Sequence, residues 1–84
     1  MTTPPKTVLV VEDDAAIRRG IVDALKFAGY AVIACGCGQE GQDTALQAQL
    51  DLVVLDVMLP KVSGTSILAA IRRARPSLPV ILVT

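Results

Sequence analysis

The chain has 84 residues, enough for one small domain at most and few for a domain of alternating helices and strands. Its formal net charge is zero, so we expect no overall electrostatic attraction to nucleic acid or to anionic lipid. The mean hydropathy of +0.57 is high for so short a chain. These properties indicate the interior-rich front part of a larger domain instead of a complete small one.

We expect no secretory signal in the first six residues. Residues 1–6 are polar, include two prolines and precede no long apolar segment, so we expect a flexible leader. The apolar runs are too short to span a bilayer, and we expect a cytoplasmic protein without membrane contact. Because Cys35 and Cys37 are the only cysteines and histidine is absent, a zinc site is disfavoured. Both cysteines are expected to be small, reduced residues at the end of a strand.

The front half of the chain predicts two strands that alternate with two helices. Residues 7–11 are continuously apolar, as in a strand covered on both faces of a sheet. Asp14 is expected to cap a helix that ends at Gly29. A second strand is expected at residues 30–35 and a weaker helix at residues 40–49. The apolar stripe of the first helix, which we expect to be buried, consists of Ile17, Ile21, Ala24, Leu25 and Ala28.

The second half continues the alternation. Residues 51–56 predict a third strand, Ser63 is expected to cap a third helix, and Pro76 closes that helix. Residues 80–83 predict a fourth strand. The third helix is expected to bury Ile67, Leu68, Ile71 and Ala74. Three arginines at its end, expected to be solvated, are Arg72, Arg73 and Arg75.

Strands separated by helices are typical of a parallel sheet with right-handed crossovers. The fourth strand is as apolar as an interior strand, yet no further residues follow to cover it. An exposed, flat, apolar edge strand promotes association. We therefore expect a sequence cut after its fourth strand, and self-association through residues 80–83.

Acidic residues follow two of the apolar strands. Glu12, Asp13 and Asp14 come directly after the first strand, and Asp56 closes the third. In an open α/β sheet, ligands bind outside the carboxyl ends of the strands, where the strand order reverses. Carboxylates gathered there without compensation would raise the pKa of some members. A hard divalent cation with oxygen ligands offsets that repulsion, so the sequence predicts a metal site at this edge.

These features together resemble the receiver domain of two-component response regulators. The resemblance implies an α/β, flavodoxin-like, doubly wound parallel sheet. The sequence would supply a βαβαβαβ order and would lack the last strand and the last two helices. Residues 7–84 would then be the N-terminal portion of a receiver domain that follows the leader at 1–6. The resemblance rests on residues 8–14, residues 51–60, Gly64 and residues 79–84.

The resemblance implies a signalling phosphoacceptor, not an enzyme. Asp56 would accept a phosphoryl group from a sensor histidine kinase, with Mg²⁺ as cofactor. The metal would be bound directly by Asp13 and through water by Glu12, together with Asp56 and the backbone carbonyl of Met58. The Thr84 hydroxyl would bond the phosphoryl group. An unidentified output domain or target would read the signal, with no direct nucleic-acid contact from this segment. The lysine that the family carries at the end of its fifth strand has no counterpart in these 84 residues.

Two other interpretations remain open from the sequence. Gly36, Gly38 and Gly41 follow a strand and open a helix, and Asp56 lies twenty residues after the first of them. This pattern is typical of a Rossmann enzyme that binds a dinucleotide, of which the chain would be a fragment. It would leave the acids after the first strand without a purpose. The other interpretation is a receiver-like interaction module that works without phosphorylation, which the retained acids disfavour. Replacing Asp56 by Asn would separate that module from a phosphoacceptor.

Overall fold

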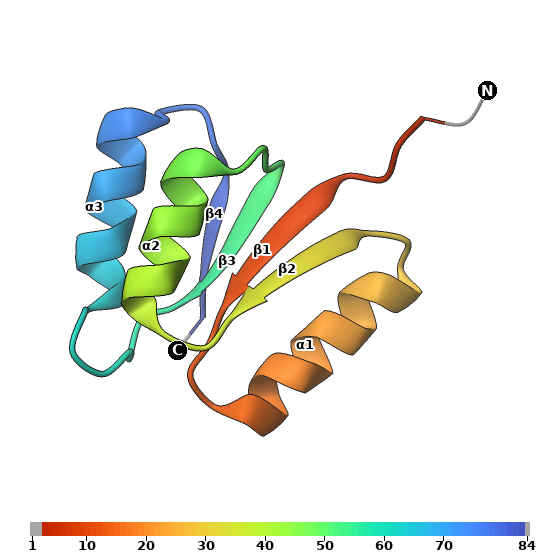
Figure 1. The fold of residues 1–84 in the computed structure, drawn as a ribbon, viewed down its shortest axis with the longest axis horizontal. Coiled ribbons are helices and arrows are strands. Elements are labelled where there is room, and N and C mark those ends of the chain that lie inside the picture. Colours follow the sequence, from red (N-terminus) through yellow and green to blue (C-terminus); the bar gives the residue numbers. More distant parts are fainter. Residues whose placement is uncertain (1–2, 84) are drawn as a thin grey trace.

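The computed structural model describes residues 3–83. One parallel sheet has the strand order β2-β1-β3-β4, and a helix connects each strand to the next in sequence (Figure 1). The expected α/β parallel architecture is therefore confirmed. The strands are β1 (Thr7–Val11), β2 (Ala31–Cys35), β3 (Leu52–Asp56) and β4 (Val80–Val83), and the helices are α1 (Ala15–Phe27), α2 (Gly38–Gln47) and α3 (Gly64–Ala74).

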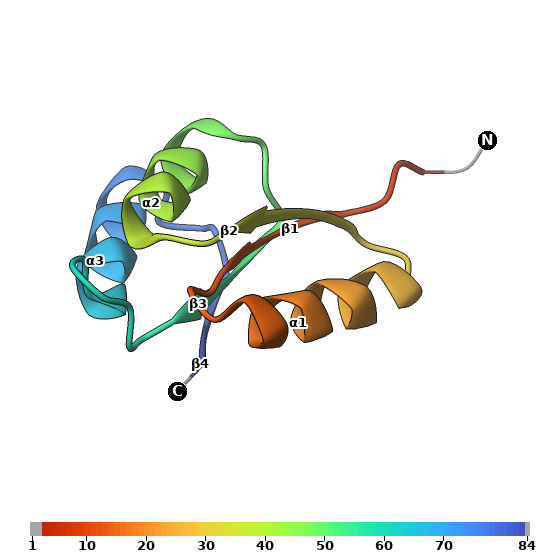
Figure 2. The ribbon, with the colours of Figure 1, turned by 60° about the horizontal axis from the view of Figure 1, so that its bottom comes forward.

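The helices cover both faces of the sheet. Helix α1 lies on one face, while α2 and α3 lie together on the other (Figure 2). The hydrophobic core fills the space between the sheet and the α2–α3 layer. Alternate residues of β1 and β3 point into it, and α3 contributes two fully buried isoleucines. These central core residues are Leu9, Val11, Val53, Leu55, Ile67 and Ile71. No helix within residues 3–83 is long and apolar enough to cross a membrane.

Helix α1 is less buried than the sequence suggested. Helix α1 packs on β2 and β1, yet none of its residues is buried, and Ile17 is 52% exposed. The expectation of a buried apolar stripe is therefore wrong for Ile17, Ala24 and Ala28, while Ile21 and Leu25 are half-buried. The reason is geometric: within residues 3–83, α1 is the only helix on this face, so one side of its stripe meets no neighbour.

The expected caps of α1 and α3 are confirmed. The Asp14 carboxylate accepts the Ile17 N–H at 2.9 Å, and the Ser63 hydroxyl oxygen accepts the Ser66 N–H at 3.2 Å. Gly29 follows α1 with φ at +98°, a conformation that favours glycine.

Helix α2 departs from its prediction. It begins at Gly38, two residues before the expected start, and no side chain caps its first turn. Cys37, in the capping position, is exposed, so the expectation that it ends a strand is wrong. Cys35 does end β2 and is buried. The glycines at this turn obscured the helix start, because a glycine fits a turn and a first helical turn equally well.

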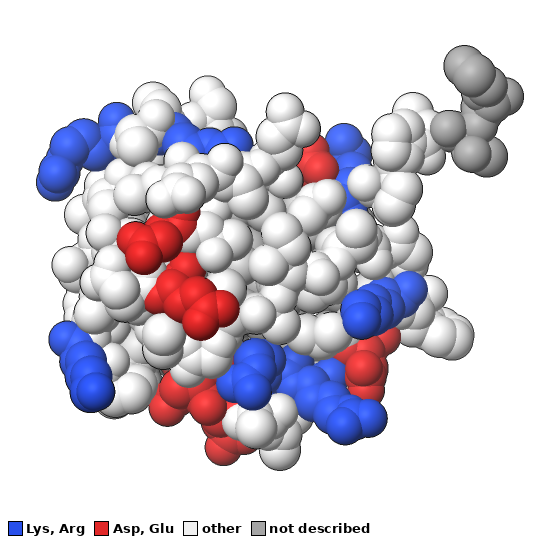
Figure 3. Space-filling view, in the orientation of Figure 1, with Lys and Arg blue, Asp and Glu red and all other residues white. Residues whose placement is uncertain are grey.

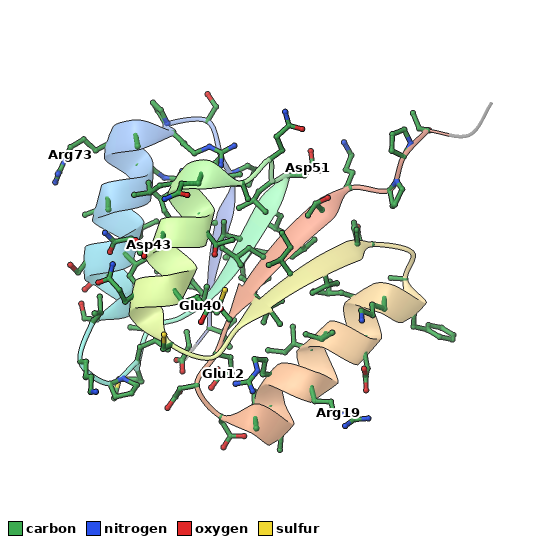
Figure 4. All side chains as sticks on the ribbon, in the orientation of Figure 1. Glu12, Arg19, Glu40, Asp43, Asp51 and Arg73 are labelled. Carbon is green, nitrogen blue, oxygen red and sulfur yellow. The ribbon has the colours of Figure 1, made fainter. Side chains whose placement is uncertain are left out.

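Two of the three arginines in the last turn of α3 and at its C-cap form hydrogen bonds with the chain and are not merely solvated. The Arg75 guanidinium donates to the carbonyl oxygens of Ala45, at 2.9 Å, and Ala48, at 2.6 Å, at the end of α2. Arg72 donates to the carbonyl of Leu78. Carbonyls at a helix C-terminus lack intrahelical partners and attract cations. The expectation of a solvated cluster is thus met only by Arg73, which points away from the molecule (Figure 4).

Candidate functional site

The acidic residues singled out from the sequence meet at one end of the sheet. Strands β1 and β3 are parallel neighbours, with Val11 beside Leu55, so Glu12 and Asp56 emerge at the same edge. This is the point where the strand order reverses, because β2 lies on the other side of β1. Figure 4 shows Glu12 at this end and Asp51 at the opposite end.

Three carboxylates form a compact cluster there. One oxygen atom from each of Glu12, Asp13 and Asp56 lies within 4.8 Å of the others. Glu12 is 6% exposed and Asp56 is 9% exposed, whereas Asp13 is open to solvent. No ion pair within residues 3–83 includes any of the three. The cluster is thus a partly buried concentration of negative charge.

Main-chain N–H groups orient two of the three carboxylates. The Asp14 N–H donates to Glu12 Oε1 at 3.1 Å, and the Met58 N–H donates to Asp56 Oδ1 at 2.9 Å. The Glu12 N–H in turn donates to the Cys35 carbonyl at 3.1 Å, which extends the pairing of β1 with β2. Both buried acids therefore have fixed backbones and partly fixed side chains.

The electrostatics match the prediction of a crowded acidic site. Burial raises the pKa of Glu12, and the nearby charge of Asp56 raises it further, against the lowering effect of the hydrogen bond from the Asp14 N–H. The folded chain thus holds the Glu12 carboxylate at an electrostatic cost. A cation among the three carboxylates would remove that cost.

The donor set fits Mg²⁺. All three side chains offer carboxylate oxygens, the ligands this hard ion prefers, and Mg²⁺ retains several waters beside one or two carboxylates. Two oxygens bound directly to one Mg²⁺ at about 2.1 Å can be at most about 4.2 Å apart. The cluster, whose oxygens lie within 4.8 Å, needs only a small closure or a water in place of one ligand.

Glycine at position 64 lets α3 approach this edge closely. A Cβ atom at Gly64 would lie only 2.4 Å from the Asp56 carbonyl oxygen and 2.7 Å from the Val57 Cα. The Gly64 N–H also donates to the Val57 carbonyl at 3.2 Å. Any larger residue at 64 would displace the segment that carries Asp56.

The remaining predicted residues have different outcomes. Asp14 caps α1 and lies outside the metal-binding group, as expected. Met58 follows Asp56 closely, with its side chain 77% exposed; its carbonyl as a metal ligand stays a prediction. Thr84 lies outside the described residues.

Sequence reasoning missed Arg18, which reaches the acidic loop from α1. Its Nη1 donates to the Glu12 carbonyl at 2.9 Å. The available signal was its position, one helical turn after the Asp14 cap, where a long side chain points back toward the helix start. The pattern of acidic residues at strand ends indicated only the carboxylates as site residues.

The glycines of the alternative dinucleotide pattern are in contact with this chain's own side chains. A Cβ at Gly38 would lie 3.1 Å from the Val62 Cβ, and one at Gly41 would lie 2.6 Å from the Val11 Cγ1. Their small size therefore serves packing of the β2–α2 turn and of α2 against the sheet. That role accounts for them without a bound pyrophosphate.

Comparison with known proteins gives a consistent result. The family model of the response regulator receiver domain matches residues 8–84. The probable transcriptional regulatory protein TcrX of Mycobacterium tuberculosis is 40% identical over 80 residues. The match covers 95% of this chain and 34% of that protein, so the chain spans about a third of the length of such relatives.

Solved structures agree. A CheY-like receiver domain protein of Methanospirillum hungatei superimposes with a TM-score of 0.91 at 32% identity, covering 95% of this chain and 64% of that one. The regulator TrrA of Thermotoga maritima, solved in complex with Mg²⁺-BeF, gives a TM-score of 0.89 at 31% identity, covering 92% of this chain and 67% of that one. TrrA is also solved in complex with the histidine kinase ThkA. The acidic edge, the strand order and these matches show that the chain belongs to the response regulator receiver domain family, whose members are signalling domains and not catalytic enzymes.

Proposed function

We propose that the chain is a phosphoacceptor that takes a phosphoryl group from a sensor histidine kinase onto Asp56 with the help of Mg²⁺. The observation that carries the proposal is the cluster of Glu12, Asp13 and Asp56 at the strand-order reversal, with oxygens within 4.8 Å. Membership of the receiver family and the Mg²⁺-BeF complex of TrrA support it.

In the proposed reaction, a carboxylate oxygen of Asp56 attacks phosphorus as the phosphorus–nitrogen bond of a phosphohistidine breaks. The imidazole leaves with the electron pair and takes up a proton, and Asp56 becomes an aspartyl phosphate. The hydrogen bond from the Met58 N–H to Asp56 Oδ1 orients the carboxylate, and we assign the attack to its other oxygen, Oδ2. Catalysis here is largely positioning, because phosphoryl transfer demands little covalent work from the protein.

The neighbouring acids would hold the cation. Asp13 would bind it directly and Glu12 through water, together with Asp56 and the backbone carbonyl of Met58. When bound, Mg²⁺ neutralises charge on the phosphoryl oxygens. We further propose that the hydroxyl of Thr84 bonds the phosphoryl group after transfer.

The partners belong to the same proposal. The complex of TrrA with ThkA supports a sensor histidine kinase as the phosphodonor. The output domain or target that reads the phosphorylated state is unidentified, and we propose no nucleic-acid contact from this segment. A cytoplasmic location and self-association through the edge of β4 complete the proposal.

The test uses a small acyl phosphate as phosphodonor and intact mass as readout. With Mg²⁺ present, the chain is expected to gain the mass of one phosphoryl group, and the Asp56→Asn variant to gain none. Asp51→Asn is the matched control, because Asp51 lies at the opposite end of the sheet and accepts the Thr7 N–H. No mass gain in the unsubstituted chain, or an equal gain in Asp56→Asn, would overturn the proposal. The first outcome would favour a phosphorylation-independent interaction module, and the second would place the phosphoryl group on a residue other than Asp56.

A further inference from the structure

Arg18 occupies an unusual position beside the acidic cluster. It lies in the first turn and a half of α1 and is half-buried. Its Nη1 donates to the Glu12 carbonyl at 2.9 Å and lies 3.5 Å from the Asp13 carbonyl. These two carbonyls belong to the residues whose side chains supply two of the three clustered carboxylates.

The guanidinium binds the main chain and not the carboxylates. Within residues 3–83, the recorded ion pair is between Arg19 and Asp23, on the exposed side of α1, and Arg18 takes part in none. At the lower edge of the molecule in Figure 3, Lys and Arg side chains lie beside acidic ones, so an arginine here is expected to pair with a carboxylate unless its geometry holds it elsewhere. The hydrogen bonds of Arg18 are therefore directed at the backbone of the β1–α1 loop.

The turn after β2 fixes the other side of this guanidinium. A Cβ placed on Gly36 would lie 3.0 Å from Arg18 Nη1 and 3.5 Å from its Cζ, so the group rests directly on the glycine. The Glu12 peptide is consequently held from two directions. Its N–H donates to the Cys35 carbonyl at 3.1 Å, and its carbonyl accepts from Arg18.

We propose that Arg18 is a positioning residue that holds the backbone of Glu12 and Asp13 so that their carboxylates are set for the cation, and that Gly36 is small because the guanidinium lies on it. The inference rests on the proposed function, since it assigns Mg²⁺ to this cluster. It extends that function to two residues outside the acidic cluster. Groups that orient metal ligands typically change metal affinity 10–100-fold when removed, as an order of magnitude.

A purely electrostatic role predicts the opposite sign. Arg18 carries a positive charge close to a cation site, so removing that charge alone would tighten Mg²⁺ binding. A positioning role predicts weaker binding on removal, because the loop that carries two ligands loses its support. The direction of the change therefore distinguishes the two roles.

The experiment compares Mg²⁺ affinity, measured by amide NMR titration, in the unsubstituted chain and in five variants. Arg18→Met is expected to weaken binding roughly tenfold, in line with other residues that orient metal ligands. Arg18→Lys, which keeps the charge and one donor group, is expected to recover part of the loss. Gly36→Ala is expected to weaken binding by a smaller factor, and to have no further effect when combined with Arg18→Met. Arg19→Met removes the adjacent, solvent-exposed arginine and is expected to leave the affinity unchanged.

A second readout needs no metal. In the Mg²⁺-free chain, ¹⁵N relaxation is expected to show greater backbone mobility at residues 12–14 in Arg18→Met than in the unsubstituted chain. Tighter or unchanged Mg²⁺ binding in Arg18→Met, or unchanged mobility of that loop, would overturn the inference. If the unsubstituted chain binds no Mg²⁺, the proposed metal site fails, while the mobility measurement still decides whether Arg18 holds the loop.

Discussion

The two cysteines, only two positions apart, show how strongly the environment of single residues differs along this chain. Cys35 is 2% exposed at the end of β2, and its Sγ lies 3.7 Å from the Thr44 hydroxyl. Burial, the main cause, raises the pKa of the Cys35 thiol. Cys37 is exposed at the start of α2. Because the thiolate is the reactive form, Cys35 is both shielded and less ionised than a free thiol.

We predict that iodoacetamide modifies Cys37 readily in the folded chain and reaches Cys35 only when the chain unfolds. Mass spectrometry over time would then show two separate phases, with the slow phase accelerated by urea. In Cys37→Ser the rapid phase is expected to disappear. Equal reaction rates for both thiols under folding conditions would contradict the burial of Cys35.

Charge repulsion within the acidic cluster is a second property at the residue scale. In Asp56→Asn, the amide oxygen can still accept the Met58 N–H, so mainly the negative charge is lost. Without Mg²⁺ we expect this variant to unfold at higher urea concentration. The gain is about 1 kcal/mol, the energy of two unit charges about 4 Å apart in water.

Mg²⁺ is expected to raise the urea midpoint of the unsubstituted chain, because a ligand that binds only the folded state stabilises it. Mg²⁺ is expected to raise the urea midpoint of Asp56→Asn much less. Asp51→Asn, which alters a carboxylate at the other end of the sheet, should show no stabilisation without Mg²⁺. A lower urea midpoint for Asp56→Asn without Mg²⁺ would argue against repulsion within the cluster.

At the scale of single elements, two glycines inside helices have opposite reasons to be there. Gly20 lies in α1 with nothing within 4 Å of the position a Cβ would take. Gly41 lies in α2 directly over β1, where a Cβ would come within 2.6 Å of Val11 Cγ1 and 2.7 Å of its Cγ2. A glycine in a helix interior costs about 1 kcal/mol relative to alanine. That cost is avoidable in α1, whereas in α2 it permits the close contact with the sheet.

The substitutions Gly20→Ala and Gly41→Ala are therefore predicted to change stability in opposite directions. Gly20→Ala should stabilise the chain by about 0.5–1 kcal/mol through helix propensity. Gly41→Ala should destabilise it by about 1–3 kcal/mol, because Val11 is fully buried and cannot move aside without strain. Urea unfolding of both variants checks the prediction, which would fail if Gly41→Ala were as stable as Gly20→Ala.

The contrast between these glycines also marks what the sequence could predict. The caps at Asp14 and Ser63 were predictable, because capping depends on residues within one turn of the helix start. The same holds for the existence of the helices and strands, which follow from local patterns of apolar residues. The contact of Gly41 with Val11 and the support of Glu12 by Arg18 could not be predicted in this way. Both depend on distances between segments that only the folded chain defines.

At the scale of the whole molecule, the order of strands creates the site. Neither Glu12 nor Asp56 is distinctive alone, but the adjacency of β1 and β3 brings them together at one edge. That adjacency was predictable from the parallel alternation of strands and helices together with the acids at two strand ends. The exposure of the apolar side of α1 was not predictable. The spacing of apolar residues along a helix does not reveal how much of that side a neighbouring element will cover.

The open edge of β4 is the other property of the whole molecule. The carbonyls of Pro79 and Val83 accept N–H groups of the β3 segment, so by alternation the peptide groups of Val80 and Leu82 face outward. Within residues 3–83, no strand pairs with that edge, where Ile81 is 52% exposed and Leu82 is 40% exposed. An apolar edge with free peptide groups is a template for strand pairing.

We predict that the chain self-associates through this edge in a concentration-dependent manner. Ile81→Lys places a charge on the exposed face of β4 and is expected to shift the population toward monomer. Sedimentation velocity over a range of concentrations would measure the self-association of the unsubstituted chain and its reduction in Ile81→Lys. The control Ile33→Lys alters a similarly exposed side chain on β2, at the other edge of the sheet, and is expected to change association less. A monodisperse monomer for the unsubstituted chain would contradict the prediction.

The most direct test of the central claim, a single Mg²⁺ site made by the acids at the ends of β1 and β3, is a titration of the chain with Mg²⁺ followed by amide NMR. A parallel titration with a nicotinamide dinucleotide serves as the comparison. We predict saturable shifts at residues 12–14 and 56–58 with Mg²⁺, and none at Asp51 or with the nucleotide. Silence at both acidic segments, together with nucleotide-induced shifts at residues 36–41, would contradict the account.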